Sequence, residues 1–228
     1  MTSQKLPGSV AARNGSGDAD LTIMTAAHDG LRRDLAALAG AAQRSGRGPE
    51  RQRSVAAGWE LFKRQLHLHH AAEDDLIWPA LRERLGHSAA ALSVLDDMEA
   101  EHQRIDPLLV AVDAGFASAA GPAGSQPSAD LLTDAVDALA AALSGHLTHE
   151  EKDGLPLIGM ALTAPEWRRV GFKIARANGL SASGEMFSWL LSSAAPGQVR
   201  AITGQLPPPA RVLYKTVWKP RFEKTERW

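Results

Sequence analysis

The sequence predicts an all-α protein: an antiparallel up-down four-helix bundle followed by a C-terminal extension of short helices. Two observations support this fold class. Apolar residues recur at steps of three and four along four long segments, which is the spacing of an inward-facing helical stripe. No segment alternates with the period of two that marks a half-buried strand, and β-branched residues are sparse. Gly/Pro-rich stretches separate the segments, so we expect four helices joined by loops.

Each predicted helix has its own apolar stripe. The first helix begins after Asp18 and Asp20, residue types that favour a helix start. Segments of about 25 residues span roughly 37 Å at 1.5 Å per residue, which suits a bundle. The stripes are Leu31, Leu35, Leu38 and Ala42 in the first segment; Val55, Trp59, Phe62, Leu66, Leu76 and Ala80 in the second; Leu95, Met98, Ile105, Leu109, Val112 and Phe116 in the third; and Leu132, Val136, Leu139, Leu143 and Leu157 in the fourth.

The charge distribution divides the 228-residue chain into unlike parts. Residues 1–162 carry 14 basic and 22 acidic residues, whereas residues 163–228 carry 11 basic and 4 acidic residues. We expect a flexible Gly/Ser-rich N-terminus over residues 1–17, the bundle over 18–160 and a basic helical extension over 161–228. The opposite net charges of the last two parts favour docking of the extension on the bundle.

The extension contains several short helical patterns. A helix over Glu166–Ala177 is expected to end at Asn178-Gly179, a frequent helix C-terminal signal. Further helices are expected over Ser183–Ala194, Pro196–Gln205 and Pro209–Val217. Seven large apolar residues are candidates for burial against the bundle: Trp167, Phe172, Met186, Phe187, Trp189, Leu190 and Trp218.

The basic and aromatic tail, Arg211–Trp228, leaves two interpretations open. A patch for nucleic acid or a membrane surface is one. A cap over the bundle or a segment that docks a partner is the favoured one. With a net charge of −1, the whole chain gives no general argument for a nucleic-acid partner.

Composition excludes several classes of chemistry and location. The chain has eight histidines and no cysteine, so it has no disulfide, thiolate metal site or cysteine nucleophile. Any metal must therefore bind nitrogen and oxygen ligands. No apolar run reaches the roughly 18 residues of a membrane span, and residues 1–17 lack the apolar core of a signal peptide. A cytoplasmic location is the default expectation.

Polar residues interrupt the apolar stripes near the middle of each helix. An unpaired polar group at such a core position costs about 1–3 kcal/mol, and a buried charge costs more. A metal ion that binds imidazole and carboxylate together offsets all of these costs. The six interrupting residues are His28, His69, Glu73, His102, His146 and Glu150.

The second and fourth segments repeat one pattern in the same register. In each, a histidine is followed four residues later by a glutamate and ten residues later by a proline. The matched residues are His69, Glu73 and Pro79 in the second segment and His146, Glu150 and Pro156 in the fourth. His70 and Asp74 form a second His-x-x-x-acid pair, but only the His69/Glu73 pair keeps both the stripe and the distance to the proline. A His and a Glu four apart share one helix face and can reach one metal centre.

This constellation resembles the hemerythrin-like family, also called the HHE cation-binding domain, and in particular its branch with the order H-HxxxE-H-HxxxE. The resemblance covers roughly residues 20–160 and implies an oxo- or hydroxo-bridged pair of iron ions, with Glu73 and Glu150 as bridging carboxylates. The nitrogen and oxygen donors also suit zinc or manganese as substitutes. Oxygen-carrying hemerythrins have a second histidine four residues before the third-helix ligand, where this chain has Met98. One coordination position is therefore expected to be open or water-filled, which argues against simple O2 carriage.

The remaining polar residues receive weaker interpretations. His67, His70, His87 and His149 lie off the stripes and are expected at the surface or outside the ligand set, although contact of His70 or His149 with the metal stays open. Four carboxylates either orient the ligand imidazoles or lie on a solvated helix face: Asp74, Glu99, Asp106 and Glu151.

The expected function is binding of, reaction with or sensing of a small oxidant: hydrogen peroxide, nitric oxide or O2. One alternative is a di-iron oxygenase for an organic substrate, with the extension forming part of the pocket. Another is a non-catalytic O2- or iron-responsive module that signals through the extension. A tyrosyl-radical role is disfavoured because the only tyrosine, Tyr214, is far from the ligands in sequence.

Overall fold

The structure, a computed structural model, describes residues 19–43, 48–119, 126–192 and 194–228. Within these ranges the regular elements are helices and no β-sheet forms, which confirms the all-α prediction. The expected flexible segment 1–17 and the helix-start residue Asp18 lie outside the described residues. None of the described helices is both long and apolar enough to cross a bilayer.

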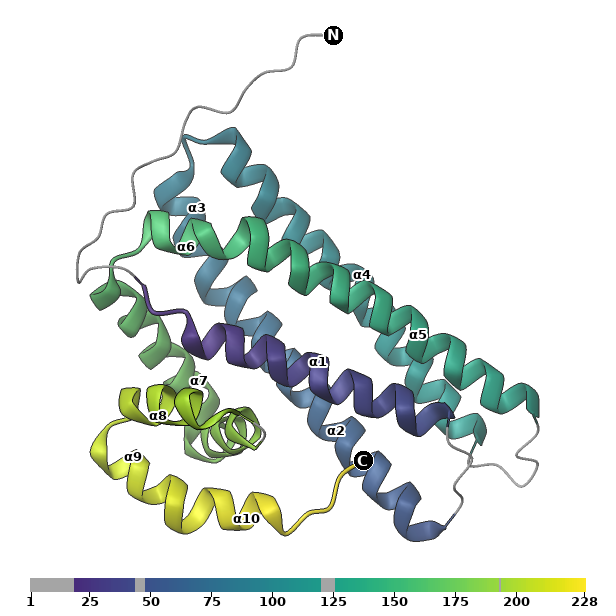
Figure 1. Cartoon of the computed structure of the whole chain (residues 1–228). Coiled ribbons are helices and arrows are strands. Elements are labelled where there is room, and N and C mark those ends of the chain that lie inside the picture. Colours follow the sequence, from purple (N-terminus) through teal and green to yellow (C-terminus); the bar gives the residue numbers. More distant parts are fainter. Residues whose placement is uncertain (1–18, 44–47, 120–125, 193) are drawn as a thin grey trace, which may run out of the picture.

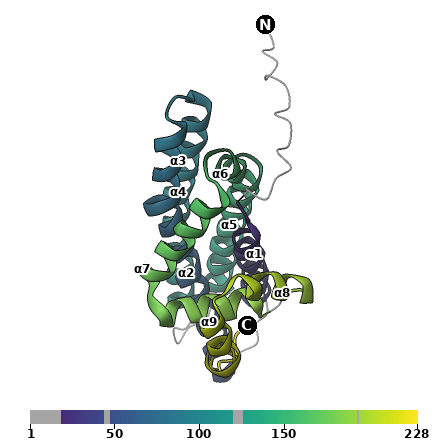
Figure 2. The same ribbon diagram turned by 90° about the vertical axis from the view of Figure 1, so that its left-hand side faces the viewer.

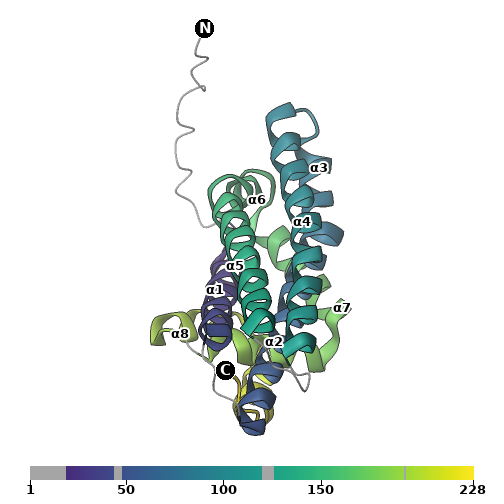
Figure 3. The same cartoon turned by 90° about the vertical axis from the view of Figure 1, so that its right-hand side faces the viewer.

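Four long helical rods form the bundle (Figure 1). The first is α1 (Thr22–Gln43) and the third is α4 (Ala89–Ala119). The second rod runs through α2 (Pro49–Ala72), a π-helical turn η1 (Glu73–Ile77) and α3 (Trp78–Leu85). The fourth runs through α5 (Gln126–His149), a π-helical turn η2 (Glu150–Gly154) and α6 (Leu155–Ala161). The helices α4 and α5 lie side by side over most of their length, as the view in Figure 3 shows.

The two π-helical turns have a local cause in the sequence. Pro79 and Pro156 lie in the first turn of α3 and α6, and a proline ring has no N–H and clashes with the carbonyl four residues before it. A wider turn relieves this clash. The Trp78 N–H therefore donates to the Glu73 carbonyl and the Leu155 N–H donates to the Glu150 carbonyl, five residues back in each rod.

The wide turn also corrects one sequence prediction. Beyond Glu73 the buried residues include Ile77 and Leu81, at 1% and 0% exposure, whereas the predicted Leu76 and Ala80 are only half-buried. Because a π-helical turn holds one more residue than an α-helical turn, the inward stripe advances by one position after η1. Elsewhere the predicted stripes are largely buried, with Ala42, Leu109 and Phe116 half-buried.

The buried apolar residues form two clusters, one at each end of the bundle. The first cluster includes Leu31, Phe62, Leu66, Ile105, Leu139, Leu143 and Trp189. The second cluster includes Met24, Ile77, Trp78, Leu95, Met98, Leu155 and Ile158. In each rod the predicted polar residues fall, in sequence, between members of the two clusters. The bundle is thus two apolar cores with a polar layer between them.

The extension contains α7 (Ala164–Leu191), α8 (Pro196–Gln205), α9 (Pro208–Leu213), a third π-helical turn η3 (Tyr214–Trp218) and α10 (Lys219–Glu223). A capping box formed by Thr163 and Glu166 starts α7. As predicted, the helix breaks at Gly179, where φ is 74° and only glycine is unstrained. Figure 2 shows the extension folded against α1 and α2.

Indole rings lying on glycines fix this docking. A Cβ built on Gly30 of α1 would lie 2.7 Å from the Trp189 ring, and one on Gly58 of α2 would lie 2.6 Å from the Trp228 ring. Inside the extension, Trp218 covers Gly184 in the same way, at 2.6 Å. Only glycine lets an indole approach a helix backbone this closely.

One expectation for the extension needs correction. Phe172 is not buried but 65% exposed, because it lies on the outer face of α7, whereas the other candidates are buried or half-buried. The described ion pairs between bundle and extension run against the net charges. Arg64 and Arg84 of the bundle pair with Glu185 and Glu166 of the extension, and exposed pairs of this kind contribute little stability.

Candidate metal centre

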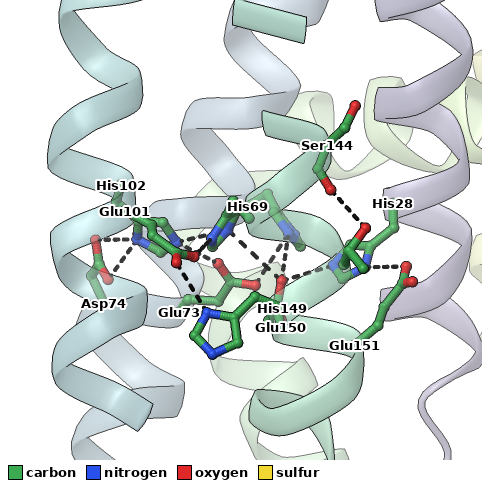
Figure 4. Close-up of polar contacts among 12 residues, drawn as sticks. His28, His69, Glu73, Asp74, Glu101, His102, Ser144, His149, Glu150 and Glu151 are labelled. Carbon is green, nitrogen blue, oxygen red and sulfur yellow. Dashed lines mark hydrogen bonds and ion pairs between the residues drawn. The ribbon is translucent and has the colours of Figure 1, made fainter. Parts of the chain in front are cut away.

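The polar layer brings together all six predicted residues, and Figure 4 labels five of them, His28, His69, Glu73, His102 and Glu150. Each of the four rods supplies at least one of them, and their side chains point toward one another across the bundle axis. They are His28 from α1, His69 from α2, Glu73 from η1, His102 from α4, His146 from α5 and Glu150 from η2. None of these side chains is more than 7% exposed, so the layer is enclosed by protein.

The two glutamates occupy the middle of the layer. Glu73 Oε1 lies 3.2 Å from His69 Nε2, and Glu73 Oε2 lies 3.4 Å from His102 Nε2. Glu150 Oε2 lies 3.0 Å from His28 Nε2 and 3.9 Å from the Nε2 atoms of both His69 and His146. Each carboxylate thus faces imidazoles from different helices.

Neither glutamate has a donor that satisfies it. Both side chains are fully buried, and none of their four oxygens accepts a hydrogen bond from the described residues. Burial, and next the charge of Glu150, raise the pKa of Glu73 well above its ordinary value. A buried carboxylate without compensation costs several kcal/mol. Two of them at the centre of a core fit a site that binds a cation.

Three imidazoles are held from outside the layer by carboxylates. In each, the Nδ1–H donates to an ionised oxygen, which leaves Nε2 as the unprotonated nitrogen on the inner side. The pairs are His28 with Glu151 at 2.9 Å, His102 with Asp74 at 2.9 Å and His146 with Glu101 at 2.9 Å. Arg32 in turn holds Glu151 through two hydrogen bonds, of 2.6 and 3.1 Å. This is the arrangement that orients histidines toward a metal ion.

The inner nitrogens of His102 and His146 face each other at 3.2 Å. When both rings are neutral and donate their Nδ1–H groups outward, both Nε2 atoms carry lone pairs and no proton lies between them. Two lone pairs at this distance repel unless a cation accepts both. The donor geometry therefore fits a metal at this point of the layer.

The pKa shifts of His69 and His146 favour neutral imidazole, whereas the shift of His28 favours the charged form in the metal-free protein. Burial, and next the neighbouring histidines, hold the pKa of His69 well below its ordinary value. Burial is also the main cause of the lowered pKa of His146. For His28, burial lowers the pKa, but Glu150 and Glu151 outweigh it and the net pKa is raised. Neutral imidazole is the form that binds metals.

The donor atoms fall into two groups that share one residue. Within each group the atoms lie within 4.8 Å of one another. One group is His28, His69, Glu73 and Glu150, and the other is His70, Glu73, His102 and His146. Glu73 belongs to both. Every donor is nitrogen or carboxylate oxygen, a set that suits iron, manganese or zinc.

His70 is a member of the layer that the stripe analysis placed outside it. Its exposure is 7%, so of the places expected for it the surface is excluded, and a place in the layer is what the structure shows. Its ring stacks on His102 with 3.8 Å between centroids, and burial together with the neighbouring imidazoles holds its pKa far below the ordinary value. The second His-x-x-x-acid pair in the sequence was the signal for this placement. His70 lies in the layer, and Asp74 accepts a hydrogen bond from the His102 ring at the outside of the layer.

The other polar predictions have mixed outcomes. Asp74 and Glu151 do orient imidazoles, whereas Glu99 pairs with Arg82 and Asp106 is exposed. Glu101 was missed, although it binds both His146 and His149. Its role depends on how α4 faces α5, which stripe spacing does not encode. The His149 side chain is 31% exposed, and His67 and His87 are exposed, as expected.

Comparison with known proteins agrees with this geometry. Searches of curated proteins and of solved structures returned no match. The family model for the hemerythrin HHE cation binding domain matches residues 19–158. The match spans all four rods and every residue of the polar layer, and it ends before the extension begins. The chain therefore belongs to the hemerythrin HHE cation-binding domain family.

Proposed function

We propose that this chain is a non-heme di-iron protein that binds, reacts with or senses a small oxidant, namely hydrogen peroxide, nitric oxide or O2. One observation carries the proposal. The four oxygens of Glu73 and Glu150 lie fully buried among imidazole nitrogens and accept no hydrogen bond from the described residues. A cation bound between these oxygens would compensate the cost of burying them.

The grouping of the donors supports a pair of metal ions. A single zinc ion takes four ligands, whereas this layer offers two donor groups joined through Glu73. A carboxylate shared between two groups, on facing helices of a bundle, is typical of di-iron carboxylate proteins. When bound, the iron pair would supply redox and Lewis-acid chemistry.

The chain supplies orientation and exclusion of water. Glu151, Asp74 and Glu101 fix the rings of three histidines and keep each Nε2 directed inward. The two apolar clusters lie on either side of the layer, and the side chains within it are almost fully enclosed. An enclosed layer admits a diatomic molecule or a peroxide more readily than an organic substrate.

The described cavities favour the small oxidant over the oxygenase alternative. A cavity of about 620 Å3 lies between α2 and the extension, with Arg64, Leu180 and Trp218 in its wall. A smaller cavity of about 230 Å3 lies beside Trp189. No residue of the two donor groups lines either cavity, so neither offers an organic substrate a place beside the centre.

The test is metal analysis followed by oxidant addition to the anaerobically reduced protein. We expect two iron ions per chain in the wild type and loss of iron in the double variant Glu73→Ala/Glu150→Ala. A matched control, Glu60→Ala/Asp137→Ala, removes two exposed acids from α2 and α5 and should keep the iron. Less than one iron per chain in the wild type, or unchanged iron in the first double variant, would exclude the di-iron centre.

Oxidant addition then separates the functions. An absorption band that forms with O2 and reverses on deoxygenation indicates a carrier or sensor. Gas evolution or oxidation of an added reductant with hydrogen peroxide indicates a peroxide-handling enzyme. Product that forms only when a reductant and an organic substrate are both present indicates the oxygenase.

A further inference from the structure

His70 presents an unusual nitrogen to the interior. The residue directly follows His69 on α2, and its Nε2 is buried without a hydrogen-bond partner among the described residues. A buried imidazole nitrogen in this state costs about 1–3 kcal/mol unless something binds it. The usual explanation for a core histidine, a satisfied hydrogen bond at each nitrogen, does not apply to Nε2.

The surroundings of His70 are the donors of one group. Its ring lies parallel to His102, with an interplanar angle of 12°, and perpendicular to His146, with 5.4 Å between centroids. One donor atom from each of these three histidines and one oxygen of Glu73 lie within 4.8 Å of one another. Four donor atoms from three helical rods thus lie close enough together to reach one ion after small side-chain rotations.

Two neighbouring histidines can both face this layer because they serve different sides of it. Successive residues on an α-helix point about 100° apart. His69 turns toward His28, with 5.0 Å between ring centroids, and His70 turns toward His102. The adjacent pair therefore reaches both donor groups from one turn of α2.

The repeat in the fourth rod lacks this feature. The residue that follows His146 is Leu147, which is fully buried in the first apolar cluster. Met98, four residues before His102, is fully buried in the second apolar cluster and belongs to neither donor group. Among the described residues of the layer, a third imidazole near His102 and His146 is therefore available only from α2.

We propose that His70 is a metal ligand, the third imidazole at the position formed by His102, His146 and Glu73. The inference rests on the proposed di-metal function and makes the two positions unequal. Three imidazoles serve the His70 position, whereas His28 and His69 serve the other. The seven protein ligands then comprise five histidines and two glutamates.

The test compares three variants by iron content, chelator competition and Mössbauer spectra. In His70→Leu we expect one iron to stay and the other to bind roughly 10- to 100-fold more weakly, with a change in one of two unequal iron signals. The control His67→Ala removes an exposed histidine from the same helix and should change nothing. The variant His70→Leu/Met98→His moves the third imidazole to α4 and should restore the second iron.

The outcomes separate this inference from the proposed function. If the wild type binds two irons and His70→Leu keeps both with unchanged affinity and spectra, His70 is not a ligand although the di-iron centre stands. If the wild type binds less than one iron, the proposed function itself fails. Circular dichroism identifies a variant that does not fold, and His70→Gln, which keeps a polar side chain of similar reach, then replaces His70→Leu in the same comparison.

Discussion

The indole N–H of Trp189 donates to Asp34 Oδ2 at 2.7 Å, although 155 positions separate the two residues. Both are 2% exposed. Arg33 also donates to Asp34, and its guanidinium lies over the Trp189 ring at 5.6 Å from the centroid. One buried carboxylate on α1 thus holds the extension to the bundle.

Trp189→Phe should destabilise the protein by at least about 1–3 kcal/mol, because one buried Asp34 oxygen loses its donor and the smaller ring leaves part of the indole's space empty. Urea denaturation measures the change. The matched control is Trp167→Phe, which removes an exposed hydrogen bond to the Asp20 carbonyl and should cost less than about 1.5 kcal/mol. Equal losses of unfolding free energy in the two variants would show that the buried hydrogen bond contributes no more stability than the exposed one.

Gly30→Ala should loosen the extension, because the new Cβ would lie 2.7 Å from the Trp189 ring. Overpacking of this kind costs about 1–3 kcal/mol. Gly171→Ala is the opposite case: nothing lies within 4 Å of the added Cβ, so we expect a gain of about 0.5–1 kcal/mol from helix propensity. Thermal melts and limited proteolysis of the extension compare the two. The same sign of change in both variants would contradict the indole contact.

Glu101→Ala should weaken metal binding roughly 10- to 100-fold, because His146 and His149 both lose the carboxylate that orients them. Glu99→Ala, two residues earlier on the same helix, removes only an ion pair with Arg82 and should leave the affinity unchanged. Chelator competition measures both affinities. If Glu99→Ala weakens binding as much, the effect is general electrostatics and not orientation of His146.

Glu73→Gln should change stability in opposite directions with and without metal. In the metal-free protein it removes one of two facing carboxylates from a dry core, so we expect a gain of about 1–3 kcal/mol. In the metal-loaded protein it removes a shared ligand and should lower the melting temperature. Melts with iron and with excess chelator give both values. A loss of stability in the chelator-treated variant would refute the repulsion between Glu73 and Glu150.

The start of α7 should depend on acid pH. Hydrogen bonds from the Thr163 backbone and from Arg84 lower the pKa of Glu166 from 4.5 to about 2. Because the folded-state pKa is depressed, the stabilisation is present above about pH 4.5 and is lost as the pH falls toward 2. Glu166→Gln should therefore be less stable than the wild type at pH 6 and equal to it at pH 2. The exposed Glu226→Gln serves as control and should show no such convergence.

The sequence was sufficient for the four rods and for six of the residues in the layer, because stripe spacing and the repeated His-x-x-x-Glu pattern are local properties. The same rule failed beyond Glu73, where the π-helical turn changes the period that the rule assumes. Pro79 was the visible signal, since a proline inside a long helix demands some local adjustment.

The spacing of apolar residues along each helix did not predict the contacts between rods. Whether Glu101 and His70 face the layer depends on how α4 and α2 are rotated about their axes. The spacing of apolar residues along one helix does not specify this rotation. The docking of the extension depends on Gly30 and Gly58 receiving indole rings from residues far along the chain. Net charge favoured docking but did not indicate which residues would be in contact.

The position of the polar layer between two separate apolar cores has a consequence for cooperativity. Neither core continues through the layer, so the halves of the bundle are joined there by the four rods, by the hydrogen bonds of the layer and by whatever its donors bind, while α7 contributes Val170 to one core and Trp189 to the other. In the two rods that contain η1 and η2, the regular helix changes at the same level. We therefore expect metal binding at the centre to make the two halves of the bundle unfold more nearly as one unit than they do in the metal-free protein.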